Sequence, residues 1–406
     1  MRNTCYYFVD DIETSFVIND IKRFSNQYEN IVLFSTEIID DKGVLPTNVT
    51  VIDNFIDWAK FNKLKIVINQ FWTLIYLYLS EIIALKKFLP LKESTALLCS
   101  NIYKAQEVKR HLSEREIHVE SDSLFYSFWF YDCIYLAYLK RINFAPKIIC
   151  RAHGGDLFEE RSSLKGKVLC RNFQLKYFEN VFSVSKIGAE YLRKKYQSFQ
   201  SKIQVSYLGS DEPKQLNEIN KDLFTLVSCA NIRDIKRVYI IAEALIYIDF
   251  PMVWYHLGDQ NLDAHNDPTI EVYKQNMLEL KNNSNVQTIQ LGQLANEEIF
   301  EFYRNTPCNL FISLSETEGI PVSMMEAISF GIPILSTDVG GCNEIVNHTT
   351  GILFPENISG KLVAKTISDF RYSTLNTDLN RIKIKNFWEE FFNQNTNYSK
   401  FFEQIK

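Results

Sequence analysis

Short apolar runs that alternate with helix-like segments constrain this chain of 406 residues more than any other feature. Runs of this kind are typical of strands buried on both faces of a parallel sheet, with the intervening segments covering those faces as helices. The first series of strands is predicted at residues 6–9, 31–34, 49–52, 65–68, 97–100, 125–128, 147–151 and 180–184. A second series is predicted at residues 224–229, 253–257, 288–291, 310–314, 332–336 and 352–354.

Polar turn residues at 205–213 (VSYLGSDEP) separate the two series and mark the predicted domain boundary. The pattern therefore predicts an α/β protein with two doubly wound, Rossmann-like domains, residues 1–207 and residues 208–385, that face a central cleft. A final stretch, residues 386–406, is aromatic and amphipathic, so its apolar face needs a surface to cover.

Net charge, cysteine spacing and apolar segments limit the possible partners and the cellular location of this chain. The net charge of −5 gives no basic excess that would favour nucleic acid. The eight cysteines show no CxxC pair and no metal-ligand spacing, so we expect reduced, buried thiols in a cytosolic protein. No secretory signal is recognised at the start of the sequence. Residues 66–89 are the most apolar stretch; a buried helix is expected there, with a helix lying on a membrane surface as the alternative.

Glycine is scarce and unevenly placed. Of 14 glycines, only Gly43 falls within the first 150 residues. A chain this poor in glycine keeps it where the backbone geometry demands it. Several glycines follow predicted strands, where ligands bind in open α/β sheets. These are Gly154, Gly155, Gly258, Gly292, Gly319, Gly340 and Gly341.

The segment 311–346 carries the strongest functional signal. Its pattern is strand, loop, helix, turn, strand, Gly-Gly loop and helix, with Glu318 in the first loop and Glu326 two helical turns later. Pro321 can occupy the first turn of that helix. The backbone amides of Gly319, Ile320 and Val322 then lie near a helix N-terminus, where they can donate to an anion or to hydroxyl groups. The carboxylate of Glu326 can accept two hydrogen bonds from a vicinal diol.

This segment resembles the signature of family 4 retaining nucleotide-sugar glycosyltransferases, which have the two-domain GT-B fold. Their E-x7-E motif matches Glu318 and Glu326, and the following A-x3-G-x-P matches Ala327, Gly331 and Pro333. Weaker similarity is found at residues 151–157 (RAHGGDL), 182–185 (FSVS), 253–259 (VWYHLGD) and 289–293 (IQLGQ). The resemblance covers residues 123–385 and is more specific in the second domain. It also implies that residues 386–406 form a helix packing back on the first domain; packing on its own domain is the alternative.

The resemblance implies roles for the residues of the second domain. Glu318 would hold hydroxyls of the donor sugar, Glu326 would hold the ribose diol, and Lys236 would stabilise the departing diphosphate. The family often has an arginine where this chain has Asn231, so Arg233 or Arg237 is a candidate to compensate, and ordinary surface charge is the equal alternative for both. The other residues implied in donor binding are Gly258, Gly292, Gln293, Gly319, Ile320, Pro321 and Val322.

In the first domain, His153 ends an apolar strand and precedes two glycines, so its side chain is expected to reach into the cleft. By resemblance, it contacts the donor sugar as a catalytic residue together with Lys236 and Glu318. Gly154, Gly155 and Asp156 are assigned to the acceptor side. Trp129 is a candidate for stacking on a sugar, but a core aromatic is an equally good interpretation.

The implied function is transfer of a hexose from a UDP or GDP sugar to a glycan or lipid-linked acceptor, with retention of anomeric configuration, as in bacterial polysaccharide synthesis. No metal and no other cofactor is expected, because no D-x-D site is evident at a strand end. The expected location is cytoplasmic, with contact at the inner face of the membrane as an option. The alternatives are an inactive sugar-nucleotide-binding protein and a GT-B epimerase or phosphorylase-type enzyme.

Overall fold

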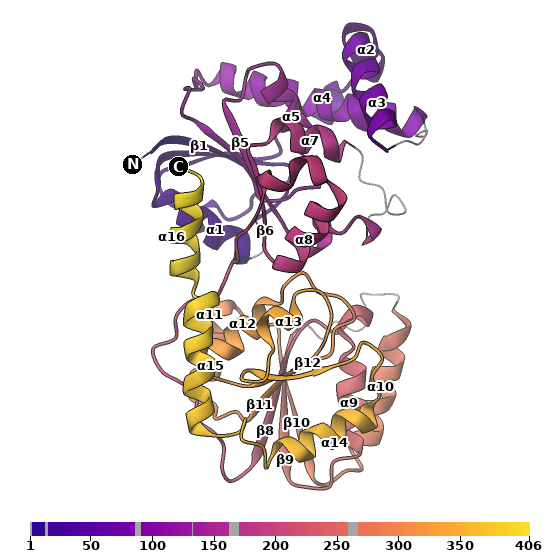
Figure 1. The fold of residues 1–406 in the computed structure, drawn as a ribbon, viewed down its shortest axis with the longest axis vertical. Coiled ribbons are helices and arrows are strands. Elements are labelled where there is room, and N and C mark those ends of the chain that lie inside the picture. The colour runs from indigo at the N-terminus through magenta and orange to yellow at the C-terminus, as the bar shows by residue number, and fades with distance from the viewer. Residues whose placement is uncertain (1, 13–14, 86–90, 132, 162–169, 259–266) are drawn as a thin grey trace. The chain divides into compact units, whose positions relative to one another are not determined.

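The computed structural model describes residues 2–12, 15–85, 91–131, 133–161, 170–258 and 267–406. The chain divides into two compact units, Met1–Val205 and Ser206–Lys406, each with its own sheet (Figure 1). Each unit is described by itself below.

The first unit contains a seven-stranded, all-parallel sheet with strand order β3-β2-β1-β4-β5-β6-β7. Its inner strands are almost wholly buried, which explains their continuous apolar sequences. Aromatic rings fill much of this core; Phe8 stacks on Phe34 with 5.0 Å between ring centroids. The strands are β1 Arg2–Val9, β2 Tyr28–Ser35, β3 Val49–Ile52, β4 Leu124–Ser127, β5 Lys147–Ala152, β6 Asn180–Ser183 and β7 Ile203–Val205.

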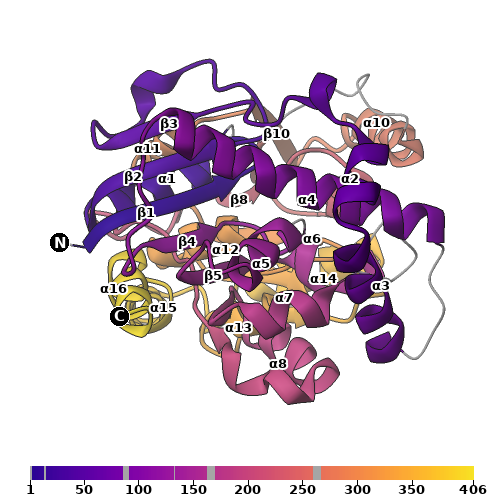
Figure 2. The ribbon, with the colours of Figure 1, turned by 90° about the horizontal axis from the view of Figure 1, so that it is seen from above.

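Helices connect these strands and cover the sheet, as the views in Figures 1 and 2 show. The helices of the first unit are α1 Ser15–Ser25, α2 Lys63–Asn69, α3 Phe71–Leu85, α4 Leu91–Glu114, α5 Ile134–Arg141, α6 Gly154–Leu157, α7 Arg171–Tyr177 and α8 Lys186–Lys195. In both views α2 and α3 lie at one edge of the unit, beside α4, which both helices contact. No single helix of the described residues meets the length and hydropathy of a membrane span, although the bent pair α2 and α3 does so jointly.

The second unit contains a six-stranded parallel sheet with strand order β10-β9-β8-β11-β12-β13. The strands are β8 Phe224–Cys229, β9 Met252–Leu257, β10 Val286–Gly292, β11 Leu310–Ser313, β12 Ile334–Thr337 and β13 Gly351–Phe354. The helices are α9 Val238–Ile246, α10 Pro268–Leu280, α11 Asn296–Asn305, α12 Val322–Ser329, α13 Cys342–Ile345, α14 Gly360–Phe370, α15 Asp378–Phe391 and α16 Gln394–Gln404. The predicted two-sheet α/β architecture is confirmed.

The C-terminal aromatic stretch forms α15 and α16, which belong to the second unit. Trp388 is fully buried, and its indole Nε1 donates to Ser210 Oγ at 2.8 Å. A backbone bridge joins Ser210 to Asn393, so the start of the second unit is tied to its last helices. That the stretch packs back on the first unit stays a prediction.

Two predicted strands are helices. Residues 65–68 lie in α2, which starts where Asn62 Oδ1 accepts a hydrogen bond from the backbone N–H of Lys65. Residues 97–100 lie in the middle of the 24-residue helix α4. Both are short apolar runs without a clear period, and such runs are ambiguous between a strand and a buried helix. The apolar stretch at residues 66–89 is helical as far as Leu85; residues 86–89 lie outside the described residues.

Both sheets reverse their strand order at one point, between β1 and β4 in the first unit and between β8 and β11 in the second. The chain leaves these neighbouring strands in opposite directions, which opens a crevice at their carboxyl ends.

Candidate active site

Lys236 and Glu318 meet at the switch point of the second unit. Lys236 closes a 3-10 turn after β8, and Glu318 lies in the loop after β11. The Lys236 ammonium Nζ lies 2.5 Å from Glu318 Oε1, and both side chains are largely shielded from solvent. The backbone N–H of Glu316 donates to the Ile235 carbonyl at 2.8 Å and locks the two loops together. A cation and a carboxylate 82 positions apart in sequence are thus paired at the switch point of the sheet.

Glycines let a second loop approach the Glu318 loop without side chains between them. A Cβ atom on Gly340 would lie 1.9 Å from the Glu318 carbonyl oxygen, and one on Gly341 would lie 2.5 Å from the Gly319 carbonyl oxygen. The N–H of Gly341 donates to the Gly319 carbonyl at 2.9 Å. Gly340 also has φ of +52°, which side-chain-bearing residues rarely adopt. The two loops therefore pack backbone against backbone, which fixes the position of Glu318.

Backbone donors are left available beside this pair. Among the described residues, no hydrogen-bond acceptor occupies the N–H groups of Gly319, Ile320 and Val322. They precede or begin α12, whose N-terminus adds a positive dipole end. This arrangement can bind an anion or several hydroxyl groups.

Glu326 is buried inside the same unit. Its side chain is 5% exposed, and Asn296 Nδ2, at the start of α11, donates to its Oε1 at 2.5 Å. Burial raises the pKa of Glu326 to about 7, against the smaller opposing effect of the Asn296 hydrogen bond. The buried hydroxyl of Tyr303 has no hydrogen-bond partner among the described residues. The sequence analysis did not identify Asn296, because its contact with Glu326 joins two helices through tertiary packing.

The remaining predicted donor residues that are described lie in the segments that end or follow β8, β9 and β10, or at the start of α12. Arg237 contacts Glu316 and the Glu356 carbonyl rather than Glu318, and Arg233, Asn231 and Gln293 are exposed. Gly258 follows β9 with φ of +149°, and a Cβ there would lie 2.0 Å from the Ala230 carbonyl oxygen. The Gly258 N–H donates to the Gly292 carbonyl oxygen at 2.8 Å, and this hydrogen bond joins the ends of β9 and β10. Asp259, the last residue of the GD motif, lies outside the described residues.

In the first unit, His153 follows β5 and packs against two aromatic rings that also contact each other. Ring centroids of Phe128 and Trp129 lie 4.6 and 4.5 Å from its imidazole. The residue is partly exposed, but both ring nitrogens are buried and have no hydrogen-bond partner among the described residues. Burial lowers the pKa of His153 to about 3, so the imidazole is neutral. A neutral ring with two unused nitrogens can donate one hydrogen bond and accept another.

Asp156 and Arg171 build the support beneath His153. The Asp156 carboxylate accepts from the backbone N–H groups of His153, at 2.5 Å, and Phe130, at 2.6 Å. The fully buried Arg171 donates to the carbonyls of Phe130 and Asp156 at 2.6 and 2.8 Å. Burial raises the pKa of Asp156 to about 7. Asp156 therefore holds the loop that carries His153, a role that the sequence did not distinguish from ligand contact.

A small hollow opens at the switch point of the first unit. It lies at the ends of β1, β2 and β4, with polar groups from Asp10, Thr36 and Lys104 and aromatic rings from Trp129 and Tyr131. Trp129 is partly exposed and lines this hollow while contacting His153. Sequence analysis identified Trp129 but missed Asp10, Thr36 and Lys104, because the latter three come from separate loops and a long helix with no local motif.

Clusters that would suggest a metal site are absent from the described part of the chain. No group of three or more His, Cys, Asp or Glu residues there has a suitable arrangement. The eight cysteines are free thiols, and all except the half-buried Cys229 are buried.

Comparison with solved structures defines the class of fold. The chain superposes over its full length on Anabaena HepE in complex with UDP and glucose, with a TM-score of 0.70 and 14% identity, covering 99% of that chain. A glycosyltransferase from Rickettsia africae gives a TM-score of 0.69 at 15% identity, with 100% of this chain and 98% of that chain covered. The lipopolysaccharide outer core galactosyltransferase WaaB gives a TM-score of 0.66 at 14% identity, with 99% and 98% covered. The fold is therefore GT-B, as predicted.

Sequence comparison finds a family match in the second unit. Residues 209–377 match the family model described as "Glycosyl transferases group 1". The O-antigen biosynthesis glycosyltransferase WbnH of Escherichia coli is 36% identical over 75 residues, which are 18% of this chain and 19% of that protein. The putative colanic acid biosynthesis glycosyltransferase WcaL of Salmonella typhimurium is 38% identical over 73 residues, 17% and 18% of the two chains. The matches thus span about a fifth of each curated relative.

Proposed function

We propose that this protein is a glycosyltransferase that moves a hexose from a nucleoside diphosphate sugar to a glycan or lipid-linked acceptor in polysaccharide synthesis. The observation that carries the proposal is the Lys236–Glu318 pair at the switch point of the second unit, beside the available amides of Gly319 and Ile320. The relatives support the same class of activity, since HepE was solved in complex with UDP and glucose and WbnH is an O-antigen biosynthesis glycosyltransferase.

The donor would be held by opposite charges and by the backbone. Hydroxyl groups of the donor sugar would hydrogen-bond to the Glu318 carboxylate in place of Lys236. The Lys236 ammonium would then be available to bind the diphosphate. Fixed positive charge at this position stabilises the negative charge that develops on a departing nucleoside diphosphate. The amides of Gly319, Ile320 and Val322 would add neutral donors, so no metal is required in this proposal.

Glu326 would bind the ribose. Its carboxylate accepts two hydrogen bonds when ionised, which suits a vicinal diol. The carboxylate is buried next to Asn296, so a diol would meet it in a site of low dielectric where hydrogen bonds to charge are strong.

The hollow of the first unit would receive the acceptor. Trp129 offers a ring for stacking on a sugar, and Asp10 and Lys104 offer charged partners for its hydroxyls. His153, neutral and lying against Trp129, would contact the transferred sugar. By the resemblance to family 4 retaining enzymes, we infer reaction on one face of the sugar with retention, and no carboxylate is assigned as a covalent nucleophile. The proposed location is cytoplasmic, at the inner face of the membrane.

A panel of nucleotide sugars in a thermal-shift assay identifies the donor, and release of the nucleoside diphosphate in metal-free buffer then measures turnover. Lys236→Ala and Glu318→Ala should each lower turnover by about 10²- to 10³-fold, the usual effect of removing one transition-state contact. Glu271→Ala, an exposed carboxylate on α10, is the matched control and should leave turnover unchanged.

Unchanged turnover in both site variants would contradict the assignment of the site. A donor-dependent thermal shift without any transfer would instead favour a non-catalytic sugar-nucleotide-binding protein, the alternative that Asn231 keeps open. Analysis of the product's anomeric configuration by NMR distinguishes retention from inversion.

A further inference from the structure

Helix α3 presents an apolar stripe to the outside of the first unit. The exposed fractions are 78% for Trp72, 37% for Tyr76, 50% for Leu79 and 74% for Ile83. Their spacing of four, three and four residues places all of them on one face of the helix. Isolated exposed apolar residues are common on protein surfaces, but a continuous row of four large ones indicates an interaction surface.

This stripe is additional to the face by which α3 packs on its own unit. Leu74 and Leu77, on the opposite side of the helix, are buried in the core of the unit. Helix α3 contacts α4 and α7 there. The helix is therefore apolar on two faces, and only one of them is used to fold the unit.

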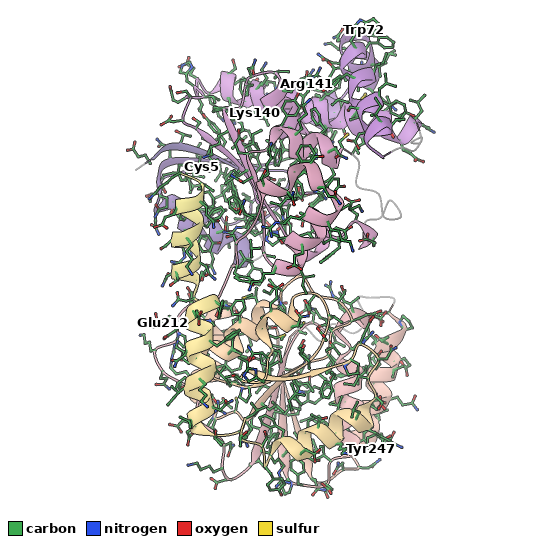
Figure 3. All side chains as sticks on the ribbon, in the orientation of Figure 1. Cys5, Trp72, Lys140, Arg141, Glu212 and Tyr247 are labelled. Atoms are coloured by element: carbon green, nitrogen blue, oxygen red, sulfur yellow. The ribbon has the colours of Figure 1, made fainter. Side chains whose placement is uncertain are left out.

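Helix α2 continues the apolar surface. Leu64 and Ile68, one turn apart, are 69% and 68% exposed, and Phe71 at the corner between the helices is 49% exposed. The two helices are bent by 87° relative to each other. Figure 3 shows Trp72 at the outer end of this pair, away from the sheet. We call the exposed residues Leu64, Ile68, Phe71, Trp72, Tyr76, Leu79 and Ile83 the α2–α3 surface.

The charges around the α2–α3 surface are positive. Lys63 and Lys65 lie on α2, whereas Glu81, the only acidic residue in either helix, is 2% exposed and faces inward. Two cations from neighbouring helices contact Tyr76: the Arg141 guanidinium lies 4.2 Å from its ring centroid, and Lys176 Nζ lies 3.5 Å from its hydroxyl. The nearby carboxylate of Asp57 is paired with Lys60 at 2.7 Å.

An apolar face with a basic rim fits one partner better than the alternatives. A two-fold interface between two copies of the chain would bring two basic rims together, which like charges oppose. A bilayer with anionic lipids could bind both parts of this surface. Trp72, Leu79 and Ile83 would insert at the boundary between headgroups and acyl chains, and the anionic headgroups would attract the lysines. Tryptophan and tyrosine also favour the membrane–water boundary. Two short helices at 87° can lie flat in that boundary with all their backbone hydrogen bonds intact.

We propose that the α2–α3 surface docks the protein on an anionic phospholipid bilayer, with Trp72, Leu79 and Ile83 inserted at the level of the headgroups and Lys63 and Lys65 contacting phosphate. The proposal concerns the surface alone and does not depend on the proposed transferase activity.

Co-sedimentation with vesicles tests this docking in the absence of any sugar donor. The full-length protein should bind vesicles of phosphatidylglycerol and phosphatidylcholine and bind pure phosphatidylcholine much more weakly, with added salt releasing part of the bound fraction. The double variant Trp72→Glu/Leu79→Glu should lower the partition coefficient at least about tenfold. The matched control is Tyr372→Glu/Leu379→Glu, which changes two residues of the second unit that are 83% and 66% exposed.

Charge reversal tests the basic rim separately. Each basic residue near an anionic surface contributes about fivefold to binding, so Lys63→Glu/Lys65→Glu should weaken it by more than tenfold. Lys221→Glu/Lys281→Glu, exposed in the second unit, is the control. All the changed side chains are at least partly exposed, so thermal unfolding should be nearly unaltered.

Two results would overturn the proposal. One is vesicle binding that the Trp72→Glu/Leu79→Glu variant retains. The other is a dimer of the unmodified protein in sedimentation velocity that the same variant dissociates, which would assign the α2–α3 surface to a second copy of the chain.

Discussion

Replacing Glu326 by glutamine should stabilise the unliganded protein in a pH-dependent way. The carboxylate is 5% exposed, and its burial raises the pKa from 4.5 to about 7. The native state then binds the Glu326 proton more tightly than the unfolded chain does. The stability contributed by the protonated carboxyl is fully present below pH 4.5 and is lost as the pH rises towards 7, where ionisation is forced in a buried site.

The magnitude follows from the two pKa values. Each pH unit between them is worth about 1.4 kcal/mol, so ionised Glu326 lowers the free energy of unfolding by about 3 kcal/mol above pH 7. A glutamine keeps the oxygen that accepts from Asn296 but does not ionise. Any cost of burying its amide is independent of pH. The difference in unfolding free energy between Glu326→Gln and the unmodified protein should therefore grow by about 3 kcal/mol from pH 4.5 to pH 7.5, most of it below pH 7.

Urea unfolding measured by hydrogen exchange of peptides from β8 and β9 reports this unit separately from the other. At pH 4.5, 6 and 7.5, the difference in unfolding free energy from the unmodified protein should stay nearly constant for the control Glu271→Gln. The same difference should increase with pH for Glu326→Gln. A Glu326→Gln offset that does not change across this range would refute the reasoning, because it would mean that the native carboxyl ionises as it does in the unfolded chain.

Three further outcomes are expected. Donor affinity, if it requires ionised Glu326, should fall about tenfold per pH unit below pH 7, and titration calorimetry should find no such slope in Glu326→Gln. Gly340→Ala should lower the free energy of unfolding by more than about 2 kcal/mol, because its Cβ would collide with the Glu318 carbonyl. Gly155→Ala is the control and should change the free energy of unfolding by less than about 0.5 kcal/mol, because a Cβ there meets nothing within 4 Å. Equal effects of the two changes in denaturant melts would contradict this prediction. Arg171→Met should cost about 2–4 kcal/mol in the same melts because two buried carbonyls lose their donors, and a neutral result would show that Arg171 does not hold the His153 loop.

The sequence predicted those parts of the fold that depend on local pattern. Most strands were recognised because continuous apolar runs end in glycine or polar turns, as β11 and β12 do. Residues 65–68 and 97–100 were assigned wrongly because a run of four apolar residues has no measurable period. Their helical state is decided by flanking residues such as Asn62, which caps α2.

The sequence also predicted only part of the candidate site. Glu318 and Glu326 lie within one motif, and Lys236 was identified by the family resemblance, so both residues of the Lys236–Glu318 pair were predicted as site residues. The contact of Asn296 with Glu326 joins residues 30 positions apart through packing of α11, and no local signal marks it. For residues 66–89 the sequence predicted a buried helix, with a helix on a membrane surface as the alternative, because apolar content alone does not distinguish a helix with one buried face from one with two.

The backbone contact between the Gly340–Gly341 loop and the Glu318 loop limits how this protein can be altered. Carbonyl oxygens occupy the places where Cβ atoms would stand, so a saturation library at Gly340 or Gly341 should return almost only the starting residue. Changes in donor choice, whether selected in the laboratory or arising in nature, must then come from side chains around this fixed backbone, such as the exposed Gln293 and Asn231. Under the proposed function, these loops would keep Lys236 and Glu318 in place while the surrounding side chains change.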